Sequence, residues 1–215
     1  MDVILDVQKL SKKFGSVLVL AETNLQLFPG EIAFLLGPNG SGKTTLLSCI
    51  AGLTRPTSGV IRVDDYDMDK DEVEVHRRLA FVPDVPRFYV ELTAWEHLRF
   101  IAMANNVLEG FENRAEKILD DFGLWTYQNY FPHHYSRGMQ LKLGLAFALI
   151  RPFQVLLLDE PTSALDQESV DVLIDYLERL RSNDTSILLS SHDPMLAERI
   201  GDRKLSIKQG AVTEV

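Results

Sequence analysis

Residues 37–45 read G-P-N-G-S-G-K-T-T, and simple patterns flank them on both sides. The run before them, Ile32–Leu36, is short and apolar, as expected of a buried strand. The run after them meets no helix breaker before Gly52, so it predicts a helix that a glycine ends. A strand, a loop of the form G-x-x-x-x-G-K-[ST] and a helix together predict a phosphate-binding loop rather than an ordinary glycine-rich turn.

The residue types in this loop suit a nucleoside phosphate. Glycines let the backbone turn tightly and approach a phosphate that a Cβ atom would obstruct. Converging amide N–H groups and the positive end of the next helix favour an anion. Lys43 is placed to reach the β- and γ-phosphates, and the Thr44 hydroxyl to ligate Mg²⁺. The predicted site comprises Gly37, Pro38, Asn39, Gly40, Ser41, Gly42, Lys43, Thr44 and Thr45.

Composition limits the classes of partner. The chain has 215 residues with 46% hydrophobic content, enough to bury a core as one domain. Its net charge of −9 argues against a nucleic-acid partner and against adsorption to anionic lipid. No apolar run approaches the ~20 residues that a membrane span requires, and residues 1–3 do not resemble the start of a signal peptide. The single cysteine, Cys49, excludes an internal disulfide and is expected to be a packed core thiol.

The first 84 residues predict mainly strands. Residues 17–20 and 24–28 are bounded by turn signals, and Phe14 is a candidate for the core of their sheet. Further strands are expected at residues 60–63 and 79–82. The acidic run at residues 64–74 is interpreted as a solvated surface segment.

Residues 85–150 are predicted to be helical. Thr93 and Glu96 form a capping-box pattern at the start of one helix. A second helix is expected to open at Asn113 and to close at Gly123, and a third to open at Ser136.

Strands and helices alternate again after residue 150. Residues 155–158 are uniformly apolar, as a parallel strand covered on both faces should be. An apolar stripe over residues 170–180 predicts a helix, residues 187–189 a buried strand, and residues 204–215 a hairpin. We therefore predict an α/β fold: a P-loop core with a mainly parallel sheet, an N-terminal antiparallel β-subdomain and an inserted α-helical subdomain. The core would span residues 1–84 and 151–215, and the helical subdomain 85–150.

Acidic and histidine residues follow two of the predicted buried strands. Asp159 and Glu160 end the first of them, where ligands gather in open α/β sheets. Asp159 can hold Mg²⁺ through water, and Glu160 can orient or deprotonate the water that attacks a γ-phosphate. His192 follows the second strand and could contact the same phosphate. The other histidines, His76, His97, His133 and His134, show no metal-ligand spacing and are expected on the surface or in packing.

Together these motifs resemble the nucleotide-binding subunit of ATP-binding-cassette (ABC) transporters over almost the whole chain. Phe14 matches the aromatic residue that stacks on adenine, and His192 the switch histidine. Ser163–Asp166 matches the loop that contacts the second protomer of a dimer. Residues 135–139, Y-S-R-G-M, stand where the family carries its signature L-S-G-G-Q.

The chain departs from the family pattern at two places. In the signature only Ser136 and Gly138 keep the family identity, and the form Y-S-[RK]-G-M resembles compact subunits linked to exporters. A hydroxyl, an unobstructed backbone and a helix N-terminus aimed at phosphate are nonetheless retained. Asp84 stands where the family usually has glutamine, and it can accept from water or approach Mg²⁺ but cannot donate as an amide can. It is either a tolerated substitution, a solvated loop acid, or a change in how the two lobes respond to the γ-phosphate.

The resemblance implies an ATPase that uses ATP and Mg²⁺. Two protomers would pair head to tail, as a homodimer or with a close relative, with each ATP held by one P-loop and the other chain's Ser136 and Gly138. Residues 85–135 would dock on a transmembrane permease, placing the chain in the cytoplasm at the inner face of the membrane without insertion. The alternatives are a soluble ABC ATPase outside transport and an ATP-binding scaffold with little turnover.

The loop assignment predicts the effect of removing its lysine. Lys43→Ala should abolish ATP binding, because the cation that meets the phosphates is lost. Equilibrium binding of a fluorescent ATP analogue measures this. Undiminished binding by the variant would contradict the assignment of residues 37–45 as the phosphate site.

Overall fold

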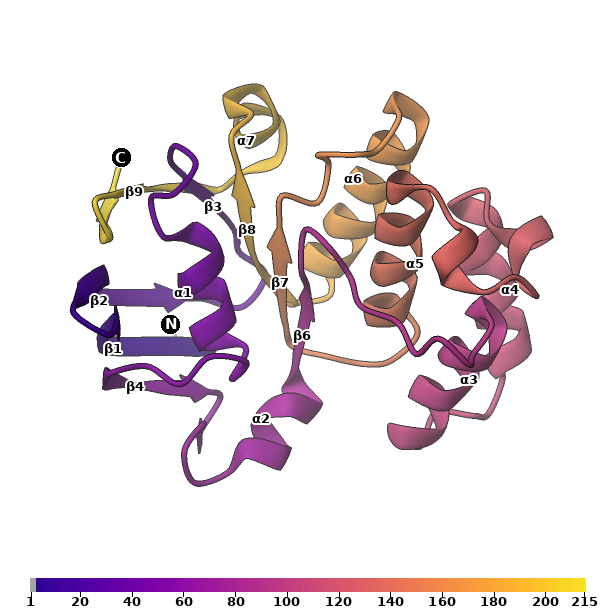
Figure 1. Ribbon diagram of the computed structural model, residues 1–215, viewed down its shortest axis with the longest axis horizontal. Helices are drawn as coiled ribbons and strands as arrows, with labels where there is room; N and C mark the ends of the chain where they lie inside the picture. The colour runs from indigo at the N-terminus through magenta and orange to yellow at the C-terminus, as the bar shows by residue number, and fades with distance from the viewer. Residues whose placement is uncertain (1–2) are drawn as a thin grey trace. The chain divides into compact units, whose positions relative to one another are not determined.

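The computed structural model describes residues 3–215 and shows an α/β fold built on two sheets (Figure 1). One is a four-stranded sheet with the order β2-β1-β4-β5, and the other is a six-stranded sheet with the order β10-β9-β3-β8-β7-β6. The predicted antiparallel β-subdomain and mainly parallel core sheet are confirmed. Residues 1 and 2, which belong to the predicted core range and N-terminal segment, lie outside the described residues.

The four-stranded sheet is antiparallel. Its strands are β1 Leu5–Phe14, β2 Val17–Leu27, β4 Ser58–Val63 and β5 Tyr66–Asp67. The register between β1 and β2 shifts at several points, and β2 continues through residues 21–23, where the sequence predicted a break between two strands.

The six-stranded sheet is parallel at its centre. Strand β3 (Ile32–Leu36) lies between β8 (Ser186–Ser191) and β9 (Arg203–Lys208), and β8 also pairs in parallel with β7 (Val155–Asp159). Strand β6 (Leu79–Val82) forms one edge, and β10 (Ala211–Glu214) forms the other by pairing antiparallel with β9. The predicted terminal hairpin is confirmed, and its turn places Gln209 and Gly210 at positive φ.

Helix α1 (Lys43–Ile50) packs between the two sheets. Its buried residues Leu46, Leu47 and Ile50 join one apolar cluster with side chains of β1, β2, β3 and β7. Cys49 is fully buried in this cluster, and burial raises the pKa of its thiol to about 11, so the thiol packs as an inert apolar group.

The chain divides into two compact units, each described here by itself. The phosphate-loop unit comprises the chain up to Phe81, Phe153–Glu160 and Tyr176–Val215. The helical unit comprises Val82–Pro152 and Pro161–Asp175. The sequence analysis placed Pro161–Asp175, the second range of the helical unit, in the core. The predicted boundaries at residues 84 and 151 stay predictions.

The helical unit is organised by capped helices. Helix α3 (Ala94–Ala104) begins with the predicted capping box, in which Thr93 accepts from the Glu96 amide and Glu96 accepts from the Thr93 amide. Helix α5 (Arg137–Leu149) begins at Ser136, whose hydroxyl accepts from the Met139 amide. The remaining elements are α4 Phe111–Asp121, η1 Trp125–Tyr127, η2 Pro132–His134 and α6 Gln167–Ser182, the last shared by both units.

Several local predictions were wrong. Helix α4 begins after Gly110, which lies at φ 64°, and not at Asn113, because the apolar Phe111 buries itself in the first turn. Residues 64–74 lie on the surface, as predicted, but the sequence missed that they contain β5 and the start of α2 (Glu72–Arg78), which buried Val75 anchors. Helix α7 (Pro194–Ile200) was also not predicted. Phe14 lies at the end of β1 with 51% of its surface exposed, outside the core.

Buried His97 makes the helical unit sensitive to acid. Its Nδ1–H donates to the Thr93 carbonyl at 2.7 Å, and its Nε2 accepts from the Tyr89 amide at 2.9 Å. Burial lowers the pKa of His97, so the folded chain holds the neutral ring while the unfolded chain binds a proton near its ordinary pKa of 6.5. This contribution of His97 to the free energy of unfolding is therefore fully present above the ordinary pKa of 6.5 and is lost as the pH falls below it.

We expect His97→Gln to lower the free energy of unfolding by about 1–3 kcal/mol at pH 7.5, because two buried hydrogen bonds are perturbed. The variant should also lose less stability than the parent between pH 7.5 and 5.5. Urea melts at both pH values measure this, with the exposed His133→Gln as the matched control. Equal pH dependence in the parent and in His97→Gln would contradict the role of His97.

Candidate functional site

The predicted phosphate loop connects β3 to α1. Gly42 takes the N-cap position of α1 at φ 109°, and no side chain caps the helix, so its first amides are left for an external acceptor. The Ser41 hydroxyl is buried without a hydrogen-bond partner. Pro38, Asn39 and Gly40 form an exposed tip, Thr44 is exposed on the first turn of α1, and Thr45 is partly buried.

Packing also requires glycine in this loop. A Cβ atom at Gly37 would lie 2.5 Å from the Ile207 carbonyl of β9, and one at Gly42 would lie 2.8 Å from the Leu20 side chain. The sequence explained these glycines by the approach of a phosphate alone. At Gly37 and Gly42 close contact with the protein's own strands is a second and independent reason.

Lys43 is buried and turns back into the loop. Its ammonium donates to the Gly37 carbonyl at 2.8 Å and lies 3.3 Å from Glu160 Oε1. A cation anchored in this way is held at the mouth of the anion-binding loop.

Asp159 and Glu160 lie at the carboxyl end of β7, as predicted. Asp159 is buried and accepts from Ser190 Oγ at 2.6 Å, and the same Ser190 oxygen accepts from the Glu160 amide at 2.9 Å. Glu160 has φ 48°, a conformation that costs energy in a non-glycine residue and is often found at functional sites. Its carboxylate lies between Lys43 and His192, with His192 Nδ1 2.7 Å from Glu160 Oε2.

Ser190 is a site residue that sequence reasoning missed. It pairs in register with Asp159 across β7 and β8 and is fully buried. The available signal was the pair of serines, residues 190 and 191, that follows the apolar residues 187–189 and stands just before His192.

The structure brings Lys43, Asp159, Glu160 and His192 together in the phosphate-loop unit. Phe14, also in this unit, presents an exposed ring with the Lys12 ammonium 4.6 Å from its centroid, and no described contact joins it to the phosphate loop. An exposed ring is available for stacking on a base.

The other predicted site residues belong to the helical unit. Ser136 is the N-cap of α5, and a Cβ atom at Gly138 would lie 2.6 Å from the Ala164 carbonyl, so glycine lets residues 163–166 pack on this helix. Asp166 accepts from the Ser169 amide and hydroxyl at the start of α6 and from Lys142 of α5 at 3.0 Å. These bonds, those from Ser169 first, hold the pKa of Asp166 well below its usual range. Asp84 accepts from Arg137 and from Ser163.

Comparison with known proteins assigns this arrangement to a family. The model of the family described as ABC transporter matches residues 20–163, from β2 past Asp159 and Glu160. The chain belongs to the ABC transporter family. It is an ATP-binding, ATP-hydrolysing domain of that family, as its motifs predicted.

Relatives and solved structures agree with this assignment. The chain is 32% identical to an uncharacterized ABC transporter ATP-binding protein, YdbJ, of Bacillus subtilis, over 97% of this chain and 68% of the relative. It is 31% identical to the lipoprotein-releasing system ATP-binding protein LolD of Leptospira interrogans, over 98% of this chain and 91% of the relative.

Solved ABC structures have the same fold. An ATP-binding subunit of an ABC transporter superposes with a TM-score of 0.93 at 32% identity, covering 99% of this chain and 89% of that one. A dimeric post-hydrolysis cassette bound to ADP and phosphate superposes with a TM-score of 0.89 at 28% identity, covering 98% and 97%.

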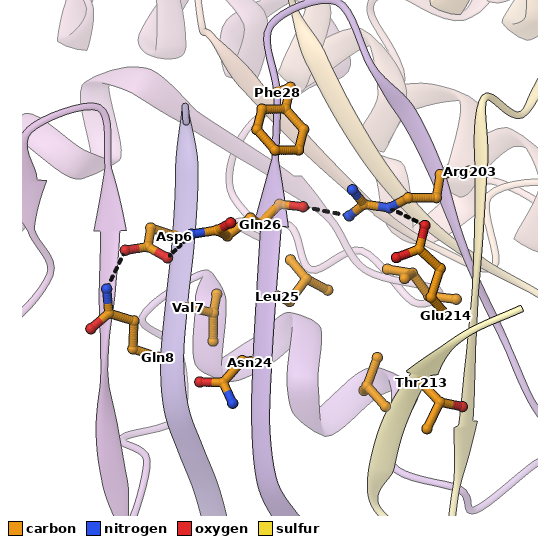
Figure 2. Close-up of a pocket in the computed structure, with 12 residues that line it drawn as sticks. Asp6, Val7, Gln8, Asn24, Leu25, Gln26, Phe28, Arg203, Thr213 and Glu214 are labelled. Carbon is orange, nitrogen blue, oxygen red and sulfur yellow. Dashed lines mark hydrogen bonds and ion pairs between the residues drawn. The ribbon is translucent and has the colours of Figure 1, made fainter. Parts of the chain in front are cut away.

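One cavity of the ABC ATPase lies away from these residues. A cavity of about 420 Å³ within the phosphate-loop unit is lined by residues of β1, β2, β9 and β10 (Figure 2). Arg203 on its wall donates to the Gln26 carbonyl and pairs with Glu31 at 3.1 Å, and Asp6 accepts from Gln8 and Gln26. Arg203 Nε is buried without a hydrogen-bond partner, and the cavity holds none of the predicted site residues.

Residues 3–215 hold neither a cluster of metal-ligand side chains nor a membrane-spanning helix. These residues contain no cluster of three or more histidine, cysteine or acidic side chains arranged to hold a metal ion. In the same range, no helix has the length and hydrophobicity needed to cross a membrane.

We expect Ser190→Ala to lower kcat for ATP hydrolysis by about 10-fold or more, since Asp159 and the Glu160 amide both lose a buried partner and shift. Steady-state phosphate release measures this. The matched control is Ser186→Ala, which removes another buried β8 hydroxyl whose partner is the Phe28 carbonyl. That control should lose stability with kcat retained. Equal kcat for the two variants would show that Ser190 contributes only to folding.

Proposed function

We propose that this ABC ATPase is the ATP-driven subunit of a membrane transporter and that each ATP is held by two chains. The phosphate loop of one protomer would bind the triphosphate, and Ser136 and Gly138 of the other protomer would close the site. The observation that carries the proposal is the Glu160 carboxylate between Lys43 and His192. A general base, a phosphate-binding cation and a phosphate-sensing histidine then converge on one place.

The proposed reaction is hydrolysis of the bond to the γ-phosphate. A water oxygen attacks the γ-phosphorus and gives a proton to Glu160, while the bond to the bridging oxygen breaks and ADP leaves with the electron pair. Lys43 would neutralise charge on the β- and γ-oxygens, which means that phosphate replaces part of its contact with Glu160. In the neutral ring the nitrogen that faces Glu160 carries the proton, so His192 would turn from that carboxylate to donate to a γ-phosphate oxygen, and at 67% exposure its side chain has room to do so.

The chemistry of the available donors fits Mg²⁺. The exposed Thr44 hydroxyl at the start of α1 would be a direct ligand, and Asp159, fixed by Ser190, would bind through water. When bound, the ion supplies positive charge to the phosphate oxygens. Asp84 was a further candidate ligand, and Arg137 and Ser163 both bond to its carboxylate.

Dimer opening would couple hydrolysis to work. Because both chains would contact the γ-phosphate, its loss would lower the affinity of the two protomers for each other. The protomers would be identical or closely related, with Ser163–Asp166 facing the partner.

A transmembrane permease is the proposed membrane partner. The helical unit exposes Val85, Tyr89, Val90, Phe100 and Met103, all within residues 85–135. Exposed apolar side chains of this kind are suited to burial against a protein partner. Relatives named as transport and lipoprotein-releasing ATP-binding proteins support this role, and the chain would lie at the cytoplasmic face of the membrane.

Substitution of the proposed base tests the function. Glu160→Gln should slow hydrolysis by ~10²–10⁴, about 3–5 kcal/mol in activation free energy, because the amide cannot take the proton. ATP binding should survive and dimers should accumulate. Phosphate release and light scattering after size exclusion measure the two effects, with Glu178→Gln on the exposed face of α6 as control. Normal turnover by Glu160→Gln would remove the general base from the proposal.

A further inference from the structure

The two departures from the family pattern contact each other. Arg137 follows the N-cap of α5, and its Nη2 donates to Asp84 at 2.8 Å to Oδ1 and 3.1 Å to Oδ2. Both residues belong to the helical unit, so their contact lies within one compact body. The residue that replaces the family's glutamine is therefore the partner of the residue that replaces a signature glycine.

Asp84 also holds a third segment. Ser163 Oγ donates to Asp84 Oδ1 at 2.8 Å, and the Ala164 carbonyl lies against Gly138. At the other end of this segment, Asp166 pairs with Lys142 of α5. Residues 163–166 are thus fastened to α5 at both ends, and Asp84 joins them to the start of the helix.

The energetics argue against a role in folding alone. Arg137 is 59% exposed and Asp84 is 35% exposed. An ion pair in contact with solvent to this degree contributes about 0–1 kcal/mol to stability. The pair is neutral only while both partners are present. Removing one partner leaves a net charge beside Ser136 and Gly138, and that charge acts on a nearby anion.

We propose that Asp84 and Arg137 act together as a positioning pair for the second half of the ATP site. Asp84 holds Arg137 and residues 163–166 so that Ser136 and Gly138 face the ATP of the other protomer. Arg137 in turn cancels the Asp84 charge, which would otherwise repel the triphosphate. This inference rests on the proposed two-chain site and assigns Asp84 a role in holding the protein rather than the metal ion.

A double-mutant cycle on steady-state ATPase tests the pair. Arg137→Ala should raise KM for ATP by about tenfold, because the Asp84 charge is left uncompensated. Asp84→Asn should lower KM, since the amide oxygen can still accept from Arg137 and Ser163 and hold both in place, while the positive charge of Arg137 is no longer cancelled. The double variant should return KM to within about threefold of the parent, because both charges are gone. A double variant as impaired as Arg137→Ala would overturn the proposal.

The salt dependence of KM for ATP distinguishes an electrostatic effect of Arg137 from a packing effect. The KM defect of Arg137→Ala should shrink in 0.5 M NaCl relative to 0.05 M, because ions screen the repulsion. Arg137→Lys keeps the charge and should stay within about threefold of the parent KM at both salt concentrations. A defect that is insensitive to salt and shared by Arg137→Lys would overturn the proposal and assign Arg137 to packing.

Controls separate failure of the pair from failure of the two-chain site. Arg77→Ala removes another exposed arginine paired with a carboxylate, Glu74, and should leave KM and kcat unchanged. Thermal melting should place every variant within a few degrees of the parent. If Glu160→Gln forms ATP-dependent dimers and Arg137→Ala has the parent KM, only the positioning pair is refuted. If Glu160→Gln forms no dimers with ATP bound, the two-chain site and the pair fall together.

Discussion

The parallel pairing of β3, β8 and β7 is the constraint on which the phosphate-loop unit depends. It sets Leu36 against Ser191 and Asp159 against Ser190, so the phosphate loop, the two carboxylates and His192 all leave the sheet at one edge. Parallel strands pair through backbone hydrogen bonds, their apolar side chains are buried on both faces of the sheet, and the polar residues follow where the strands end. Lys43, Glu160 and His192 come from distant parts of the sequence, and their contacts follow from this register.

Several site residues serve packing and chemistry together. Gly37 admits the Ile207 carbonyl beside the loop that binds phosphate, and Gly138 admits the Ala164 carbonyl beside the signature helix. Ser136 caps α5, and Asp166 caps α6 while it pairs with Lys142. Because these atoms stabilise the local backbone, part of the signature's residue pattern reflects folding.

Sequence reasoning failed where packing overrode local pattern. Residues 64–74 lie on the surface, as their charge suggested, but charge alone did not reveal the helix that starts at Glu72 and is anchored by buried Val75. Helix α4 starts at Phe111 because burial of that ring outweighs the better capping residue Asn113. Phe14, a candidate core residue, is exposed at a strand end, which fits its alternative assignment as a stacking residue. Ser190 gave only a weak signal, since β8 carries three serines and the role of this one depends on Asp159, which lies opposite it on β7.

The sequence by itself determined the phosphate loop, the α/β class, the main helix caps and the ABC family, because each of these depends on residues close together in the chain. Local spacing carries such information through backbone geometry and short-range hydrogen bonds. Only the tertiary structure decided which charges meet. Glu160 lies between Lys43 and His192, and Asp84 pairs with Arg137, 53 residues away. Charge pairing across such separations depends on how sheets and helices pack, and that information is spread over the whole apolar core.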